Sequence, residues 1–560
     1  MNPRPGAPEA TLAVPAVGEE AAPRPARWRR LWELLRESLR PPSPQPLHPD
    51  WFSAAELASY HRAMLRTAAG AEVIDDATWS DLQVDAWLRQ LAGETSLCGR
   101  QLLLQRLRSG CAEPARSQAA KVAHDPATAA LLAAAAPARE QLRCVRLDLV
   151  PALFDEALPR LPAWAGRLWL VPLLLTAGVG VALGLSPLAG ALVLLAWAAV
   201  SAFFVARLSA PLRHWREIRE SLCMLLAAGQ ALAAVARRAP PPWLAGLVEI
   251  ETKLQRQWRR LTPNALERLP GVPEYLNLVG LYDYTRMRRQ LAALRADLPT
   301  LRDCYERIAA ADAELALARH LRNTPGWCLA ECGAARQLRL QALVHPLLAQ
   351  AQPLTVQLDD HGLLITGHNG VGKSTLLRAV GLSLMGARAF GFCYAQAATV
   401  PDRPPMTSIE NHDNLQTADS LYMAELRRAA AMLATARSGG GAVFLIDELF
   451  RGTNPVESVS AAAAVLATLA RHSLVLASTH HGVLAPLLRG PLRPMCVVRQ
   501  AGPQHSVALE PGVLVDPNGI EMMRQHALPS EVVESARRIA AWLAKHDAQA
   551  QDLPEWPDER

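Results

Sequence analysis

Two segments of this chain have the residue types and spacing of a phosphate-binding site. In the first, residues 363–375 (LLITGHNGVGKST), a short apolar strand runs into a glycine-rich turn and then into helix-forming residues. The pattern G-x-x-x-x-G-K-[ST] begins at Gly367 and ends at Ser374. In this pattern backbone N–H groups surround phosphates, the lysine reaches the terminal phosphates and the hydroxyl binds Mg²⁺. The helix that follows adds the positive end of its dipole, so the segment predicts a nucleotide-binding loop.

The second segment supplies two carboxylates. Residues 442–448 (AVFLIDE) form an apolar run that ends in Asp447 and Glu448, as expected for a parallel strand covered on both faces. Asp447 would face Mg²⁺, and Glu448 could orient or deprotonate an attacking water. Another apolar run, residues 473–479, ends at His480, which could sense a γ-phosphate. A chance glycine turn and a surface Asp-Glu pair are the alternatives, but the joint order of strand, loop and carboxylates favours a Mg²⁺-dependent ATPase that binds ATP.

Composition sets wide limits on the rest of the chain. Its 560 residues are enough for several domains. A net charge of +6 is mild for this length, so it permits contact with nucleic acid or anionic lipid without requiring either. The nine cysteines contain no C-x-x-C pair, which indicates free thiols suited to a reducing cytosol.

Two neighbouring segments, 168–185 and 188–206, contain no charged residue. Each is close to the roughly 18–20 residues that cross a bilayer as a helix, so they predict a transmembrane hairpin in contact with lipid. Arginines before the first and after the second segment favour cytoplasmic flanks, which predicts a two-pass protein of the inner (cytoplasmic) membrane. Neither segment carries an ionisable residue for a transport path, which favours an anchor over a channel. A buried hairpin in a soluble core is the alternative.

These patterns predict six consecutive regions. They are a disordered, basic N-terminal segment (1–50) with an amphipathic helix over 26–40, a helical core (51–160), the hairpin region (161–210), a helical core and lever (211–342), an ATPase domain (343–545) and a flexible tail (546–560).

The nucleotide-binding segments resemble the MutS-type ATPases of DNA mismatch repair. Residues 367–375 (GHNGVGKST) are similar to that family's G-P-N-x-x-G-K-S-T loop, and residues 412–426 (HDNLQTADSLYMAEL) to its D-D-L-x-x-G-x-S-T-F-M-x-E-M signature. Residues 447–453 (DELFRGT) resemble D-E-x-G-R-G-T, and residues 478–481 (STHH) resemble A-T-H-Y. A weaker likeness to the family's helical core and lever covers residues 96–102 and 308–321.

The resemblance implies a fold and a role for each matching residue. The fold is an α/β P-loop NTPase domain, MutS/ABC-like with a mostly parallel sheet, preceded by a largely α-helical core and lever that contains the hairpin. Ser374 and Asp447 would hold Mg²⁺, Glu448 and Lys373 would be catalytic with His480 as the γ-phosphate sensor, and Ser420 would reach the partner's nucleotide across a homodimer. The ATP-binding residues would be Gly367, His368, Asn369, Gly370, Val371, Gly372, Lys373, Ser374 and Thr375. DNA is the implied partner.

The chain also departs from the family pattern. His368 replaces a proline in the phosphate loop, and Phe450 replaces a glycine after the carboxylates. Ala418 and Leu421 replace a glycine and a threonine of the signature. The region before the hairpin is short and helical, and residues 154–156 (FDE) match the mismatch-reading motif only as a tripeptide, so these residues give no support for mismatch recognition. The alternative function is a membrane-bound signalling or scaffolding switch acting on an unknown protein partner. A transporter ATPase is disfavoured by the two spans.

Overall fold

The computed structural model describes residues 45–48, 51–66, 73–111, 118–160, 170–238, 241–262, 276–277, 282–368, 370–409, 421–438, 441–499, 507–514 and 529–546. The chain divides into residues 1–45 and residues 46–560, and all that follows concerns the second unit. The expected N-terminal amphipathic helix and the C-terminal tail after residue 546 lie outside the described residues.

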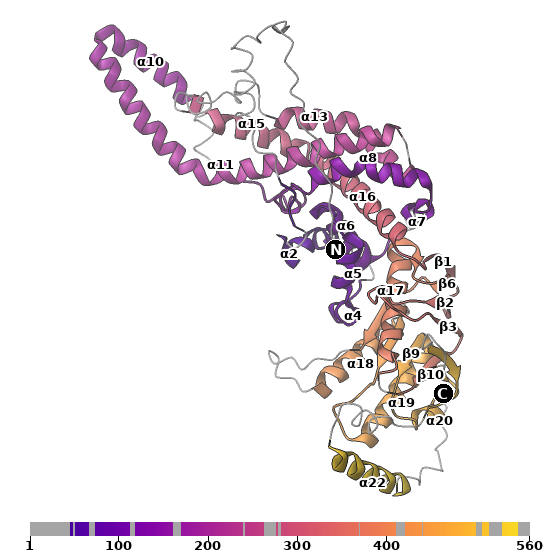
Figure 1. Cartoon of the computed structure of the whole chain (residues 1–560). Coiled ribbons are helices and arrows are strands. Elements are labelled where there is room, and N and C mark those ends of the chain that lie inside the picture. The colour runs from indigo at the N-terminus through magenta and orange to yellow at the C-terminus, as the bar shows by residue number, and fades with distance from the viewer. Residues whose placement is uncertain are drawn as a thin grey trace, which may run out of the picture. The chain divides into compact units, whose positions relative to one another are not determined.

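The N-terminal region is helical, as the sequence predicts (Figure 1). Its helix α6 begins after Ser96, whose side chain accepts a hydrogen bond from the backbone N–H of Gly99, and ends at Gly110 with φ 77°. A serine cap and a terminal glycine are the usual sequence signals for these two ends. The helices are α2 (Ala54–Leu57), α3 (Ser59–Leu65), α4 (Asp76–Asp81), α5 (Val84–Ala92), α6 (Leu97–Ser109), α7 (Gln118–Val122), α8 (Pro126–Leu142) and α9 (Val150–Leu153).

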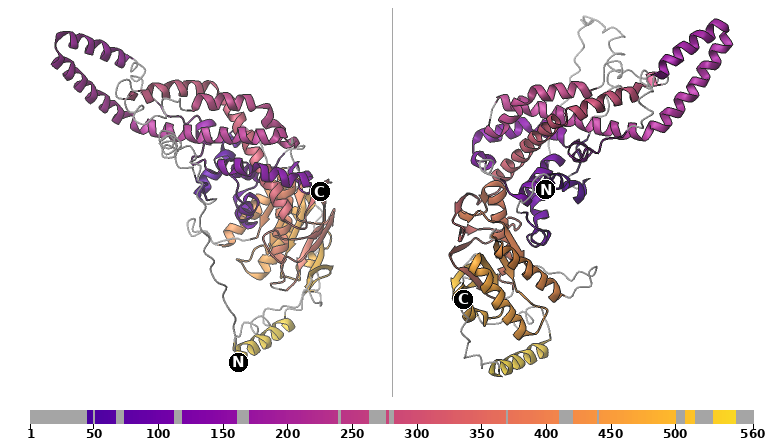
Figure 2. Two further views of the ribbon diagram at one scale, coloured as in Figure 1. Left: turned by 45° about the horizontal axis from the view of Figure 1, so that its top comes forward. Right: turned by 180° about the vertical axis from the view of Figure 1, so that it is seen from behind.

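The apolar segments form a helical hairpin. Helices α10 (Leu170–Leu185) and α11 (Pro187–Arg238) lie side by side in every view (Figures 1 and 2) and are joined at Ser186, whose Oγ accepts a hydrogen bond from the Ala189 N–H at 3.1 Å. The second expected span ends at residue 206, but α11 continues for 52 residues in total and includes Pro211. Apolar residues at helical spacing, such as Trp215, Ile218 and Leu222, are buried in this later part, so packing continues the helix after the uncharged run stops.

A second group of helices leads to the strands. It consists of the short helix η3 (Pro242–Leu244), α12 (Ala245–Glu249), α13 (Glu251–Leu261), α15 (Tyr282–Ala296) and α16 (Leu298–Asn323). The sequence predicted helices for the whole region 211–342. This prediction is wrong for residues 328–342, because strands start at Cys328.

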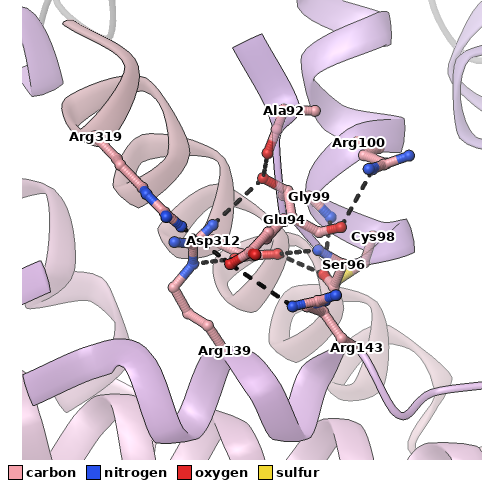
Figure 3. Close-up of polar contacts among 11 residues, drawn as sticks. Ala92, Glu94, Ser96, Cys98, Gly99, Arg100, Arg139, Arg143, Asp312 and Arg319 are labelled. Atoms are coloured by element: carbon pink, nitrogen blue, oxygen red, sulfur yellow. Dashed lines mark hydrogen bonds and ion pairs between the residues drawn. The ribbon is translucent and has the colours of Figure 1, made fainter. Parts of the chain in front are cut away.

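Buried ion pairs connect α16 to the N-terminal helices (Figure 3). The fully buried Asp312 carboxylate accepts hydrogen bonds from the Ser96 N–H at 2.9 Å, from Ser96 Oγ and from Arg139 Nε at 2.9 Å. Nearby, Arg106 of α6 pairs with Glu314 of α16 at 2.5 Å. These contacts join the start of α6, helix α8 and the middle of α16. The middle of α16 contains residues 308–321, where the sequence weakly resembles the family's lever.

Two sheets follow. A five-stranded mixed sheet has the order β3-β2-β6-β1-β5, and a six-stranded sheet has the order β11-β10-β4-β9-β8-β7. In the second sheet only the β10–β11 pair is antiparallel, so the expected mostly parallel sheet is present, whereas the mixed sheet was not predicted. The strands are β1 (Cys328–Gly333), β2 (Gln337–Leu343), β3 (Leu354–Asp359), β4 (Gly362–Thr366), β5 (Phe392–Cys393), β6 (Ala397–Pro401), β7 (Pro405–Ser408), β8 (Val443–Asp447), β9 (Leu474–Ser478), β10 (Leu492–Arg499) and β11 (Val507–Pro511).

The central strands β4, β8 and β9 of the parallel sheet are largely apolar because the two faces of the sheet enter different cores. Along β8, Val443 and Leu445 belong to one buried cluster, whereas Phe444 and Ile446 belong to the other. Successive strand residues point to opposite faces, so a strand covered on both sides needs this continuous apolar run. Helix α17 shares the first cluster, and α18 and α19 share the second. The helices of this region are α17 (Lys373–Phe390), α18 (Leu421–Arg437), α19 (Pro455–His472), α20 (Leu484–Leu487) and α22 (Ser530–His546).

Candidate nucleotide site

The glycine-rich loop connects β4 to α17 and holds a buried lysine. Gly367, Gly370 and Gly372 have φ values of 154°, 75° and 104°, a conformation that glycine adopts without steric cost. Lys373 is 6% exposed, and its Nζ donates to the Gly367 carbonyl at 3.0 Å and to the His368 carbonyl at 3.2 Å. The ammonium group therefore lies across the loop, where it can exchange carbonyl oxygens for phosphate oxygens.

The structure describes all but one of the predicted loop residues. Val371 is 8% exposed, and His368 Nδ1 is buried without a hydrogen-bond partner among the described residues. Thr375 lies in the first turn of α17. Asn369 lies outside the described residues. The loop thus offers a lysine and a helix N-terminus to an anion, a set that fits a polyphosphate.

The two predicted Mg²⁺ ligands meet although they come from different elements. Ser374 Oγ donates to Asp447 Oδ2, and Ser478 Oγ donates to Asp447 Oδ1. Asp447 is the last residue of β8 and pairs in register with Ser478 at the end of β9, so the parallel strands deliver both side chains to one edge of the sheet. Hydroxyl and carboxylate oxygens next to a phosphate loop are the ligand set that Mg²⁺ takes in nucleotide sites, so these residues fit the ion.

Glu448 follows Asp447 and faces His480. Its backbone has φ 57°, and its N–H donates to the Ser478 carbonyl at 3.1 Å. His480 Nδ1 lies 3.3 Å from Glu448 Oε1. This hydrogen bond lowers the pKa of the Glu448 carboxyl below its usual value. Burial alone would raise this pKa, whereas the charges of Arg451 and Lys373 lower it further. Glu448 is therefore a carboxylate at neutral pH, the form that can orient a water and accept its proton.

A cavity of about 210 Å³ adjoins the phosphate loop. It is lined by Gly370, Gly372 and Thr375 and by apolar residues that include Leu348 and Leu354. His345 also lines the cavity, and burial together with Arg378 lowers its pKa to about 4, so its imidazole is neutral. A largely apolar cavity beside the phosphates is suited to a nucleotide base, because it can enclose the flat ring system.

Comparison with known proteins identifies the segment that carries this geometry. A family model described as MutS domain V matches residues 363–544. This segment is similar to MutS domain V. The matched range contains the phosphate loop, both carboxylates and His480, and it begins at β4 of the parallel sheet.

Curated relatives extend the likeness beyond the MutS domain V. The proteins named DNA mismatch repair protein MutS from Synechococcus elongatus and from Thermosynechococcus vestitus are each 31% identical to the chain, over 315 and 297 residues, and the one from Thermus thermophilus is 30% identical over 269 residues. These alignments cover 52%, 50% and 46% of this chain, but only 35%, 33% and 31% of the relatives. The chain therefore spans about a third of the length of the curated relatives it matches, and its similarity to MutS proteins is established over this shared part.

Sequence reasoning missed two groups of the matched segment. Ser478 was noted only as part of a motif, yet its Oγ donates to the Asp447 carboxylate. Glu425 is fully buried, and its Oε1 accepts from the Arg451 N–H at 3.3 Å while Arg451 Nε lies 3.8 Å away. Parallel pairing of β8 and β9 could have placed Ser478, and Glu425 matches the glutamate of the family signature at residues 412–426. Ser420, the predicted trans residue, lies outside the described residues.

Proposed function

We propose that this protein is a membrane-anchored MutS-type ATPase that binds ATP and Mg²⁺ at residues 367–375 and hydrolyses the terminal phosphate. The observation that carries this proposal is the convergence of Lys373, the Ser374–Asp447 pair and Glu448 from α17, β8 and the turn after β8. Lys373 would turn from its carbonyl partners to the phosphates, and Glu448 would orient the attacking water. When bound, Mg²⁺ would neutralise phosphate charge beside Ser374 and Asp447.

In this proposal the protein acts as a homodimer, and its arginines contact the backbone phosphates of DNA. The resemblance of residues 412–426 to a trans-acting signature supports the dimer, with Ser420 directed to the partner's nucleotide. The names of the curated relatives support DNA as the first partner to test. Arginine contacts to phosphates would give binding that is sequence-independent and weakened by salt, and the comparison of mismatched with homoduplex DNA decides whether mismatches are recognised.

The hairpin is the proposed membrane anchor. The segment Pro187–Phe204 has a mean hydropathy of 2.0 and only 11% of it is buried, whereas the segment Ser209–Arg238 is 50% buried and packs as a core helix. Large apolar side chains are exposed along the hairpin, namely Leu174, Val181, Leu188, Leu192, Leu194, Leu195, Val200 and Phe203. Exposed apolar surface on several sides of a helix is suited to lipid, since water would disfavour it. We place the protein in the inner membrane as a two-pass protein with both flanks in the cytoplasm.

ATP hydrolysis by the detergent-solubilised full-length protein tests this function. It is measured alone and with homoduplex, mismatched and branched DNA, at low and moderate salt, for the parent and for Lys373→Ala. We expect hydrolysis that Lys373→Ala removes, and stimulation by DNA that falls as salt rises. Hydrolysis that no DNA changes would contradict the DNA role, and stimulation by a co-purifying protein would favour the switch acting on a protein partner.

A further inference from the structure

One serine outside the phosphate loop contacts both carboxylates of the site. Ser478 is the last residue of β9 and is 2% exposed. Its Oγ donates to Asp447 Oδ1, and its carbonyl accepts from the Glu448 N–H at 3.1 Å. Asp447 Oδ2 accepts from Ser374 Oγ. The two oxygens of the Asp447 carboxylate are therefore bonded to different hydroxyls, one from the phosphate loop and one from β9.

The register of the parallel sheet explains why these groups meet. Strand β9 lies between β4 and β8, and Ser478 pairs with Ile365 on one side and with Asp447 on the other. Paired residues of neighbouring strands point to the same face of a sheet. Ile365 packs in the buried cluster that includes α17, the helix that begins with Lys373 and Ser374. The sheet therefore directs the side chains of Ser478 and Asp447 to the face on which α17 packs.

The Ser478 hydroxyl is a feature that the family motif lacks. The motif A-T-H-Y, which residues 478–481 resemble, has an alanine at this position, so the site accepts a side chain without the hydroxyl. A buried hydroxyl is normally hydrogen-bonded, and the partner of this one is the Asp447 carboxylate. Without this donor, Asp447 Oδ1 would lose the bond that restrains rotation of the carboxylate. The hydroxyl is thus placed to control how Asp447 is oriented beside Ser374.

We propose that Ser478 is a positioning residue for Mg²⁺, whose hydroxyl holds the Asp447 carboxylate in the orientation in which Asp447 and Ser374 bind the ion. This role rests on the proposed ATPase function and deepens it. Ser478 acts through Asp447, because its hydroxyl proton is donated to that carboxylate. Removing a group that orients a metal ligand typically lowers metal affinity by about 10- to 100-fold. The Mg²⁺ concentration that nucleotide binding requires should therefore depend on Ser478.

The test compares Ser478→Ala with Ser473→Ala in the full-length protein in detergent. Ser473 immediately precedes β9 and is 5% exposed, and its Oγ has no hydrogen-bond partner among the described residues, so it is a matched buried control. Binding of a fluorescent, non-hydrolysable ATP analogue is measured first in EDTA and then as Mg²⁺ is added. Lys373→Ala shows which part of the binding belongs to the phosphate loop. Mn²⁺, followed by electron paramagnetic resonance, reports the bound metal directly.

We expect Ser478→Ala to bind the analogue in EDTA as the parent does, because the phosphate loop is unchanged. The Mg²⁺ concentration that gives half of the metal-dependent binding should rise about tenfold, and Mn²⁺ should bind correspondingly more weakly. Ser478→Thr keeps the hydroxyl and should restore the parental midpoint. A loss of stability alone would lower the amount of binding protein without moving this midpoint. Equal midpoints for Ser478→Ala and Ser473→Ala would overturn the role of Ser478 and leave the nucleotide site intact.

Two further outcomes are decisive. If Ser478→Ala does not fold, Ser478→Cys decides, because a thiol is similar in size to the hydroxyl but is a weaker donor. A two- to threefold higher Mg²⁺ midpoint in Ser478→Cys would support the proposal, and a parental midpoint would overturn it. Absence of any Lys373-dependent binding of the analogue by the parent would overturn the proposed ATP site, and the role of Ser478 with it.

Discussion

At the scale of single residues, the site depends on groups that restrain one another. Asp447 accepts from Ser374 and Ser478, and Glu448 is bonded to His480. Ser374 and Asp447 would thus be close to their metal-binding positions before nucleotide arrives, which reduces the ordering needed on binding. The sequence could predict Lys373 and the two carboxylates because their motifs are local.

Glu448→Gln tests the proposed base directly. The amide keeps the size of the side chain but cannot accept a proton, so we expect ATP to bind as in the parent while turnover falls about a hundredfold or more. Binding of a fluorescent ATP analogue and single-turnover hydrolysis measure the two effects separately. Parental turnover in Glu448→Gln would show that another group activates the water.

His480→Ala tests the cause of the lowered pKa of Glu448. The hydrogen bond from His480 is the largest factor that lowers this pKa, so removing it raises the pKa of the carboxyl. A base is active when ionised, and its rate falls as the pH drops through its pKa, so the acid limb of the turnover profile should move to higher pH. His472→Ala, at the end of α19, is a control that should leave the limb in place. An unmoved limb in His480→Ala would exclude this coupling.

At the scale of elements, the sequence predicted the parallel sheet but not the mixed one. Strands β4, β8 and β9 are continuous apolar runs, since both of their faces are covered, and such runs are visible in a sequence. Strand β1 (CLAECG) has only partly buried or exposed residues, and it is a strand because Ala330 pairs with Ala398 of β6 far along the chain. Such long-range pairing leaves no local pattern in the sequence. The hydrogen bonds of Asp81 with Thr407 and Ile409 also join distant parts of the chain, so the sequence could not predict them.

The attachment of α16 to the N-terminal helices should depend on Asp312. The Asp312→Ala substitution leaves Arg139 buried without its carboxylate partner, which costs about 3–5 kcal/mol in comparable buried pairs. We expect a clearly lower midpoint of urea unfolding, followed by circular dichroism. Asp359→Ala is the control, because its pair with Arg339 is exposed and should leave the midpoint nearly unchanged. Equal midpoints for the two variants would contradict a stabilising role of the Asp312 cluster.

At the scale of the whole molecule, the hairpin and the helical region share a single helix. The first part of α11 exposes apolar side chains, whereas its later part is packed in the same core as α8, α13 and α16. Because the helix is continuous, the anchor would hold the helical region at a fixed place on the bilayer surface. Within that region Arg139 of α8 is bound to Asp312 of α16, and Asp81 of α4 accepts a hydrogen bond from Thr407 Oγ1 of β7, the strand next to β8 in the nucleotide-binding sheet.

The membrane role predicts opposite outcomes for charges on two exposed apolar surfaces. Leu192 and Leu195 are 61% and 71% exposed on the hairpin, and Val456 is 75% exposed on α19. An arginine near the centre of a spanning helix costs about 2.5–3.5 kcal/mol, so the Leu192→Arg/Leu195→Arg double variant should lower the share of protein that floats with membranes in a density gradient. Val456→Arg should float like the parent, because α19 lies in the segment that matches MutS domain V. If the parent protein stays at the bottom of the gradient, as soluble proteins do, the hairpin is not a membrane anchor. Its exposed apolar surface would then serve in packing or in binding another protein.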